Sequence, residues 1–101
     1  MAKKYYELSA KQNYSDAIVN IGTLYYVGLG VEQSYSKAKE YFELAAKQNN
    51  SCALGYLGNM YLKGEGVDLN YSKAKEYLEL AAKQNNPDAF INLGHMYFKG
   101  Y

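Results

Sequence analysis

The sequence predicts an all-α protein, an α-α superhelix built as a right-handed solenoid of helix hairpins with six helices. Two observations predict this fold. The chain repeats every 36 residues, with residues 17–52 and 53–88 identical at 21 positions, and each half of the period has an apolar stripe at helical spacing. Because a hairpin of this length cannot bury both of its faces alone, consecutive hairpins are expected to stack.

The period divides the 101 residues into four segments of a single domain. Residues 17–52 and 53–88 are full repeats. Residues 1–16 align with residues 73–88 and are expected to form the second helix of a truncated repeat. Residues 89–101 align with residues 53–65 and are expected to form the first helix of another truncated repeat. The expected domain is therefore a solenoid fragment that begins with a second helix and ends with a first helix.

The first helix of each repeat is predicted from an apolar stripe that contains one glycine at a close helix contact. Asn86, followed by Pro87, is a strong expected N-cap, and Asn50 is a weaker one. Two glycines, at 28 and 30 or at 64 and 66, are expected to take positive φ where the chain turns back. The stripes are Ile18, Ile21, Gly22 and Tyr25; Leu54, Leu57, Gly58 and Tyr61; and Phe90, Leu93, Gly94 and Tyr97.

The second helix is expected to begin after an N-cap at Ser34 or Asn70. An asparagine at 13, 49 or 85 follows its last turn, where this residue type adopts the left-handed conformation readily. The apolar stripes are Ala38, Tyr41, Phe42, Ala45 and Ala46, and Ala74, Tyr77, Leu78, Ala81 and Ala82.

Composition and charge narrow the classes of partner. The net charge is +1, and all 11 basic residues are lysines, so the arginine-rich footprint of a nucleic-acid binder is missing. No stretch approaches the ~20 apolar residues of a membrane span, and no secretory signal is visible, so a cytoplasmic location is the default expectation. The single cysteine, Cys52, excludes an internal disulfide.

An enzyme is not expected. Cys52 lies near a predicted helix N-terminus and His95 is the only histidine, but no third orienting group or oxyanion element accompanies them. One histidine and one cysteine are also too few for a zinc site. We therefore expect no catalytic residue, no metal and no cofactor.

The repeated residues resemble a known family, the Sel-one-like repeat (SLR), a relative of the tetratricopeptide repeat with a longer loop inside each hairpin. The resemblance covers essentially the whole chain. It implies an adaptor or scaffold that holds a peptide or protein segment in a concave groove. A secreted subfamily has two cysteines per repeat, and this chain departs from that pattern. The matching residues are Ala53, Leu57, Gly58, Tyr61, Gly64, Glu65, Gly66, Val67, Tyr71, Lys73, Ala74, Tyr77, Ala81 and Ala82.

The groove is expected on the sides of the first helices that lie opposite the packing stripes. Tyr26 and Tyr56 break the repeat period, which favours a contact role over packing. Amides of the groove are expected to pair with a peptide backbone, and Lys63 and Lys99 to favour an acidic side chain or a C-terminal carboxylate. The expected groove residues are Asn20, Thr23, Tyr26, Tyr56, Asn59, Lys63, Asn92, His95 and Lys99. The alternative is that these residues form a solvent-exposed polar face with no binding role.

A structural role is the second expected function. A solenoid that lacks polar capping helices leaves apolar faces exposed at both ends. The segment 5–13 aligns with 77–85 and should fit the face exposed beside Tyr97. Head-to-tail stacking into a homo-oligomer, a self-assembling repeat array, is therefore the alternative to a peptide adaptor.

Overall fold

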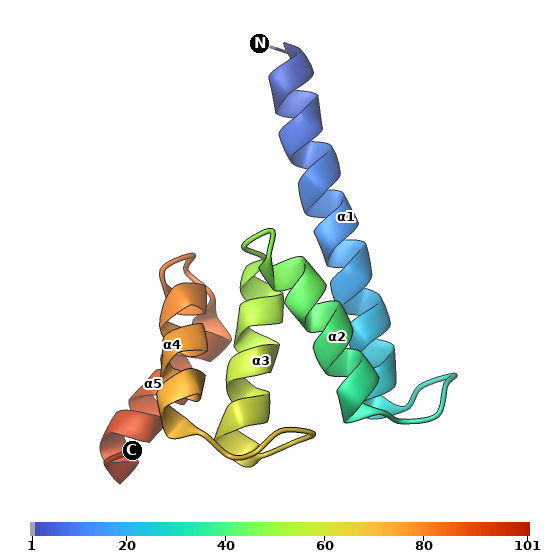
Figure 1. The fold of residues 1–101 in the computed structure, drawn as a ribbon. Coiled ribbons are helices and arrows are strands. Elements are labelled where there is room, and N and C mark those ends of the chain that lie inside the picture. Colours follow the sequence, from blue (N-terminus) through green and yellow to red (C-terminus); the bar gives the residue numbers. More distant parts are fainter. Residues whose placement is uncertain (1) are drawn as a thin grey trace.

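The described part of the chain is entirely helical apart from turns. The computed structural model describes the backbone of residues 2–101 and the side chains of residues 14–101. Its helices are α1 (Ala2–Val27), α2 (Tyr35–Ala46), α3 (Ser51–Lys63), α4 (Tyr71–Ala82) and α5 (Pro87–Lys99). They follow one another as antiparallel neighbours, and Figure 1 shows them arranged in a row from α1 to α5. The predicted fold class, an α-α superhelix of hairpins, is confirmed.

The predicted number of helices is wrong by one. Residues 1–16 and the first helix of the next repeat were expected to be separate, but α1 is continuous from Ala2 to Val27. At the equivalent turns, Asn49 and Asn85 have φ of 61° and 63°, and Asn50 and Asn86 cap the following helix. Position 14 is tyrosine instead of this capping asparagine, so the side chain that would start a new helix is missing and the helix continues. The described residues therefore form five helices.

The expected caps form at the other helix starts. The side chains of Ser34 and Asn70 accept hydrogen bonds from the backbone N–H groups of Lys37 and Lys73. Asn50 accepts from two backbone N–H groups and donates to Ser15 Oγ, at 3.0 Å, and to Asp16 Oδ1, at 2.7 Å. The Asn50 side chain is buried. Its bonds to Ser15 and Asp16 join the start of α3 to α1 across the repeat boundary.

The glycines confirm the predicted turns and close contacts. Gly28, Gly30, Gly64 and Gly66 all have φ between 68° and 77°, a conformation that side chains disfavour. A Cβ on Gly66 would lie 2.5 Å from Tyr35 Cβ, so the second glycine loop packs closely against the start of α2.

Two buried clusters form the core, each spanning one hairpin and the next helix. Their largest fully buried side chains are Phe42, Leu57, Met60, Leu78 and Met96. Several predicted stripe positions are exposed instead: Ile21 (40%), Phe90 (55%) and Tyr97 (59%). Phe90 and Tyr97 of the α5 stripe are exposed because no further helix of the described chain covers them, whereas Leu93 of the same stripe is buried. The clusters are Ile18, Val19, Ala38, Phe42, Ala45, Ala53, Leu57 and Met60, and Leu54, Tyr61, Ala74, Leu78, Ala81, Ala89, Leu93 and Met96.

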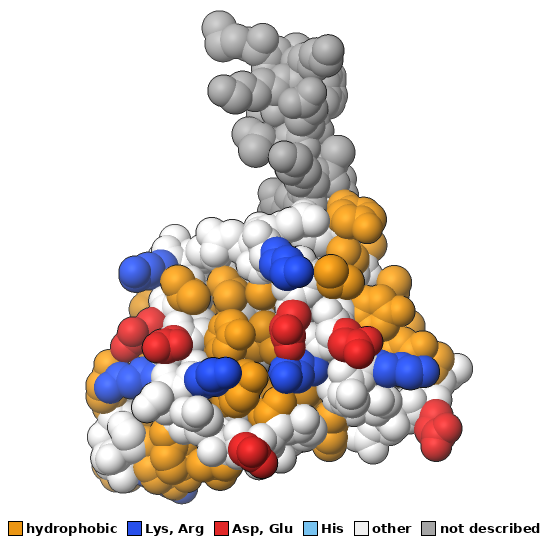
Figure 2. All heavy atoms as spheres, in the orientation of Figure 1, with side chains coloured by type: hydrophobic (Ala, Val, Ile, Leu, Met, Phe, Trp, Pro, Cys, Tyr) orange, Lys and Arg blue, Asp and Glu red, His pale blue; other side chains and the backbone are white. Residues whose placement is uncertain are grey.

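The face formed mainly by α2 and α4 is a mixed charged surface. Lysine and acidic side chains alternate across it, as Figure 2 shows. Lys39 and Glu43 form one ion pair on α2, with Nζ 3.4 Å from Oε1. Alternating charges of this kind give no single-sign field, so this face is not a surface that favours strongly acidic or strongly basic partners.

Candidate functional site

Two neighbouring hollows lie between α3 and α5, on the side where the sequence places the groove. The larger has a volume of about 460 Å³ and the smaller about 160 Å³. Both are lined by Asn59 and Asn92, so they are adjacent parts of one groove, which we call the α3–α5 groove. The larger is lined by Asn59, Leu62, Lys63, Tyr71, Ile91, Asn92, His95 and Tyr101, and the smaller by Cys52, Gly55, Tyr56, Asn59, Asn86, Asp88, Ala89 and Asn92.

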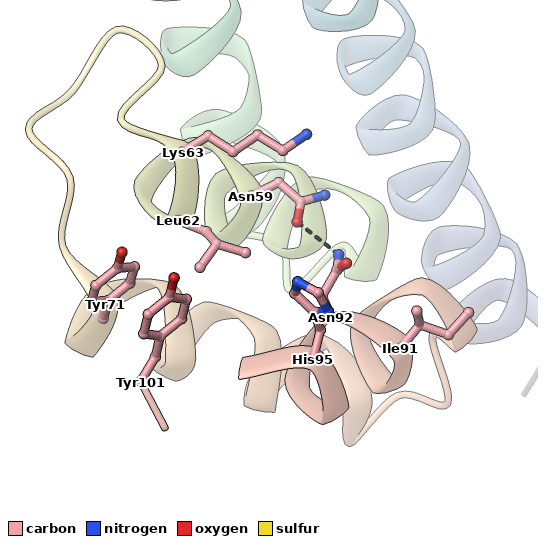
Figure 3. Close-up of a pocket in the computed structure, with 8 residues that line it drawn as sticks. All are labelled: Asn59, Leu62, Lys63, Tyr71, Ile91, Asn92, His95 and Tyr101. Carbon is pink, nitrogen blue, oxygen red and sulfur yellow. Dashed lines mark hydrogen bonds between the residues drawn. The ribbon is translucent and has the colours of Figure 1, made fainter. Parts of the chain in front are cut away.

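An asparagine pair joins the two hollows. Asn92 Nδ2 donates a hydrogen bond to Asn59 Oδ1 at 2.7 Å, and Figure 3 shows the two side chains pointing toward each other from α5 and α3. This bond uses one acceptor position of Asn59 and one donor hydrogen of Asn92. The NH₂ group of Asn59 and the oxygen of Asn92 are the donor and acceptor types with which a peptide backbone pairs.

The larger hollow combines a basic side chain with aromatic walls. Lys63 contributes its amine from α3 and His95 its imidazole from α5, and both residues are exposed. The rings of Tyr71 and Tyr101 stack with centroids 4.1 Å apart at an interplanar angle of 7° (Figure 3). Hydrogen bonding to Tyr101 is the main cause that raises the pKa of Tyr71 above its ordinary value.

The smaller hollow has the opposite charge character. Asp88, near the start of α5, lines it, together with the exposed thiol of Cys52 and the half-buried ring of Tyr56. The groove is therefore polarised, with Lys63 in one hollow and an acidic group in the other. A ligand with an anionic end has one favoured direction in such a groove.

The structure brings together five of the nine predicted groove residues: Tyr56, Asn59, Lys63, Asn92 and His95. Lys99 is exposed on α5 but lines neither hollow. Asn20 and Thr23 lie on α1, where Asn20 is exposed and the Thr23 hydroxyl donates to the Val19 carbonyl oxygen. The binding role of all nine residues stays a prediction.

Tyr26 and Tyr56 contribute to packing between α1, α2 and α3. The Tyr56 ring stacks on Phe42 with centroids 4.6 Å apart, and the Tyr26 and Tyr56 centroids are 5.8 Å apart. The Tyr26 hydroxyl donates a 2.5 Å hydrogen bond to Glu65 Oε1. Burial, and then this bond, raise the pKa of Tyr26 well above its ordinary value. Packing therefore explains why Tyr26 and Tyr56 differ from the residues at the equivalent repeat positions: both contribute to the contact of α1 and α2 with the next hairpin.

Sequence reasoning missed several lining residues of both hollows. In the larger hollow these are Leu62, Tyr71, Ile91 and Tyr101, and in the smaller hollow they are Cys52, Gly55, Asn86, Asp88 and Ala89. Tyr71 belongs to the repeated block and shares its position with Tyr35, so the repeat pattern alone assigns it no separate role. Tyr101 aligns with Glu65 and Leu29. This difference in residue type between repeats was the one sequence feature that could have indicated Tyr101 as a lining residue.

The side chains described here include no cluster of three or more histidine, cysteine or acidic residues able to hold a metal ion. Cys52 and His95 line different hollows. No helix within the described residues is long and apolar enough to cross a membrane.

The stacked hairpins define the class of protein, an α-solenoid of short helical repeats. The profile of the Sel1 repeat matches residues 1–14, 15–50, 53–86 and 87–101. The chain belongs to the Sel1 repeat family, whose members are generally non-catalytic helical scaffolds for protein–protein interaction. No curated protein matches the chain at a significant level.

The solved structures that are similar to this chain include the following two proteins. One is a protective antigen present in uropathogenic Escherichia coli strains that displays an SLR fold, with 34% identity and a TM-score of 0.82 over 85% of this chain and 18% of the antigen. The other is a Sel1 repeat protein from Oxalobacter formigenes, with 31% identity and a TM-score of 0.81 over 85% of this chain and 35% of that protein. The chain thus spans well under half the length of either relative.

Proposed function

We propose that this chain is a protein-interaction module that binds an extended, acidic peptide segment in the α3–α5 groove. The observation that supports this most directly is the arrangement of the groove: a hydrogen-bonded Asn59–Asn92 pair with Lys63 in one flanking hollow and Asp88 in the other. The pair supplies backbone-type hydrogen bonds, and the lysine supplies attraction for a carboxylate.

The polarity of the groove gives the ligand a direction. The carboxylate, from an acidic side chain or a C-terminus, lies in the larger hollow with Lys63 and His95. Apolar atoms next to it contact Leu62, Ile91 and the stacked tyrosine rings, which line the same hollow. The other end of the peptide is neutral or basic, because Asp88 repels a second carboxylate in the smaller hollow.

The experiment uses a synthetic octapeptide array that varies the number of acidic residues and compares free with amidated C-termini. Peptides that bind are then titrated by fluorescence anisotropy. We expect acidic peptides to dominate. Replacing both Lys63 and Lys99 with glutamate should abolish binding, and Lys63→Glu alone should weaken it by at least about tenfold, equivalent to roughly 1.4 kcal/mol.

Lys83→Glu is the matched control, because Lys83 is an exposed lysine directly after α4 and outside both hollows. This variant makes the same charge change and should keep the affinity of the unaltered chain. Unchanged affinity in the Lys63 and Lys99 double variant, or an equal loss in the Lys83 variant, would contradict the assignment of the groove.

The alternative function, a self-assembling repeat array, involves a different surface. Phe90 and Tyr97 leave an apolar face of α5 open to solvent, on the side opposite Asn92 and His95. Peptide binding and self-association are therefore compatible in one molecule.

A further inference from the structure

The smaller hollow of the α3–α5 groove lies beside a glycine at a position where the other first helices have a branched side chain. Gly55 is in the interior of α3 and lines this hollow. The equivalent residues one period away are Val19 and Ile91. Glycine inside a helix is less favourable than any residue except proline, so the helix itself gives no reason for a glycine here.

Helix packing does not require this glycine either. A Cβ on Gly55 would have Asn86 Nδ2 as its nearest neighbour, at 3.9 Å, which is an ordinary van der Waals distance. A Cβ on Gly58, by contrast, would lie 2.7 Å from Leu78 Cγ. The side chain that Gly55 lacks therefore leaves space in the groove, whereas the one that Gly58 lacks makes room for the next helix.

The equivalent positions between α1 and α3 have large, packed side chains. Val19, the equivalent of Gly55, is 6% exposed and belongs to the first core cluster. Tyr56, the equivalent of Asn92, packs against that cluster. Between α3 and α5 the same two positions are a glycine and an asparagine, and both line the hollow of about 160 Å³. The hollow therefore results from the residue types of this interface.

Two walls of the smaller hollow are held in place by contacts within the chain. Asn86 Oδ1 accepts a hydrogen bond from the backbone N–H of Ala89 at 3.1 Å, and Asn86 Nδ2 donates one to the carbonyl oxygen of Ser51 at 3.4 Å. The ring of Tyr56 is stacked on Phe42. These side chains have partners already, so the hollow keeps its shape without a ligand.

A third wall has a charge that is available to a ligand. Asp88 is exposed and forms no ion pair with the described side chains. Gly55, Ala89 and the half-buried Tyr56 ring offer apolar atoms beside it. A basic side chain matches both parts, because its methylene groups pack on apolar atoms while its cationic end pairs with a carboxylate.

The distance between the two hollows limits where such a residue lies in the peptide. Gly55 and Lys63 are eight residues apart on α3, which corresponds to about 12 Å along the helix axis. An extended peptide advances about 3.4 Å per residue, so about three or four residues cover this distance.

We propose that the smaller hollow binds a basic side chain of the peptide, about three or four residues from the carboxylate that lies beside Lys63. Gly55 leaves the space for the methylene groups of this side chain, and Asp88 pairs with its cationic end. This inference rests on the proposed function and specifies a second position of the same ligand.

The test uses the acidic octapeptide that binds best on the array, with any basic residue replaced by alanine. In further peptides a single lysine is moved from about two to about six residues away from the acidic end. Fluorescence anisotropy gives the dissociation constant of the alanine peptide divided by that of each lysine peptide. This ratio should be largest, about five, at a separation of three or four residues, which corresponds to a favourable exposed ion pair.

Two variants assign the effect to the hollow. Asp88→Asn removes the charge and keeps the size of the side chain, and Gly55→Val restores the residue type of position 19. Both should reduce the ratio to about one. Asp68→Asn is the matched control, because Asp68 is exposed and lines neither hollow, and it should keep the ratio of about five. Circular dichroism checks that Gly55→Val is folded, and Asp88→Asn tests the same pairing without a larger side chain.

The outcomes separate this inference from the proposed function. A ratio near one at every lysine position, while the alanine peptide still binds and Lys63→Glu still weakens it, would overturn the inference alone. A ratio that stays near five in Asp88→Asn would also overturn it, because the lysine would then lie elsewhere. If none of these peptides bound, the proposed function would be contradicted, and the basic position with it.

Discussion

Gly58→Ala is expected to leave the stability of the protein unchanged or to lower it, although alanine is the better helix former. In the α3–α4 hairpin, the new Cβ would lie 2.7 Å from Leu78 Cγ and 3.3 Å from the backbone oxygen of Ala74. Leu78 is fully buried, so its side chain has no free space into which to move. The two helices must separate by several tenths of an ångström.

The magnitude follows from two opposing terms. Replacing glycine by alanine inside a helix stabilises by about 1 kcal/mol. Overpacking a close contact costs about 1–3 kcal/mol. Gly94→Ala provides the matched control. The same change in α5 gives the same gain in helix stability, and the new Cβ would meet no atom within 4 Å. The free energies of unfolding of the two variants should therefore differ by about 1–3 kcal/mol, with Gly94→Ala the more stable.

The assay is urea unfolding followed by circular dichroism, at a concentration where light scattering shows only monomer. Gly94→Ala should raise the urea midpoint relative to the unaltered chain. Gly58→Ala should leave it unchanged or lower it. If Gly58→Ala instead raises the midpoint as much as Gly94→Ala does, the close contact between α3 and α4 does not exist as described.

The remaining predictions concern the core, a cap and a tyrosine. Phe42→Ala should lower the free energy of unfolding by about 3–5 kcal/mol in urea unfolding, because the side chain is fully buried. Asn50→Ala should cost about 1 kcal/mol more than Asn70→Ala, since both remove a helix cap but only Asn50 also bonds to α1; equal losses would contradict the bridging role. In Tyr26→Phe, the free energy of unfolding should fall less steeply with rising pH in the alkaline range than it does in the unaltered chain. The folded chain raises the pKa of Tyr26, so the unfolded chain loses this proton first and stability falls as pH rises above about 10. An equally steep fall in the variant would show that Tyr26 does not contribute.

The repeat period made most of the fold predictable. Gly22 and Gly58 occupy equivalent repeat positions, as do Phe42 and Leu78. The structure contains the same glycine contact twice, Gly22 with Phe42 and Gly58 with Leu78. The caps at Ser34 and Asn70 and the left-handed Asn49 and Asn85 followed from local backbone chemistry.

The failures occur where one repeat departs from the others. The turn at Asn13 was expected from the asparagine alone, whereas the turn also needs the capping residue that Tyr14 replaces. The aperiodic Tyr26 packs beside Tyr35 and Tyr56, a contact that the repeat pattern did not indicate, and its role in ligand contact stays a prediction.

The α3–α5 groove was predictable in position but not in composition. Helical angle placed Asn59, Lys63, Asn92 and His95 on one side, because these residues lie on the helices themselves. The wall formed by Tyr71 and Tyr101 depends on how the first residue of α4 and the residues that follow α5 meet in space. No helical periodicity relates those two positions.

The most direct test of the proposed function is an amide chemical-shift map of the ¹⁵N-labelled chain, titrated with an acidic octapeptide selected on the array. The groove predicts that the largest shifts occur at Asn59, Lys63, Asn92 and His95, and that Lys63→Glu removes them while Lys83→Glu does not. Shifts confined to the outer face of α2 and α4, or equal shifts in both variants, would contradict binding in the α3–α5 groove.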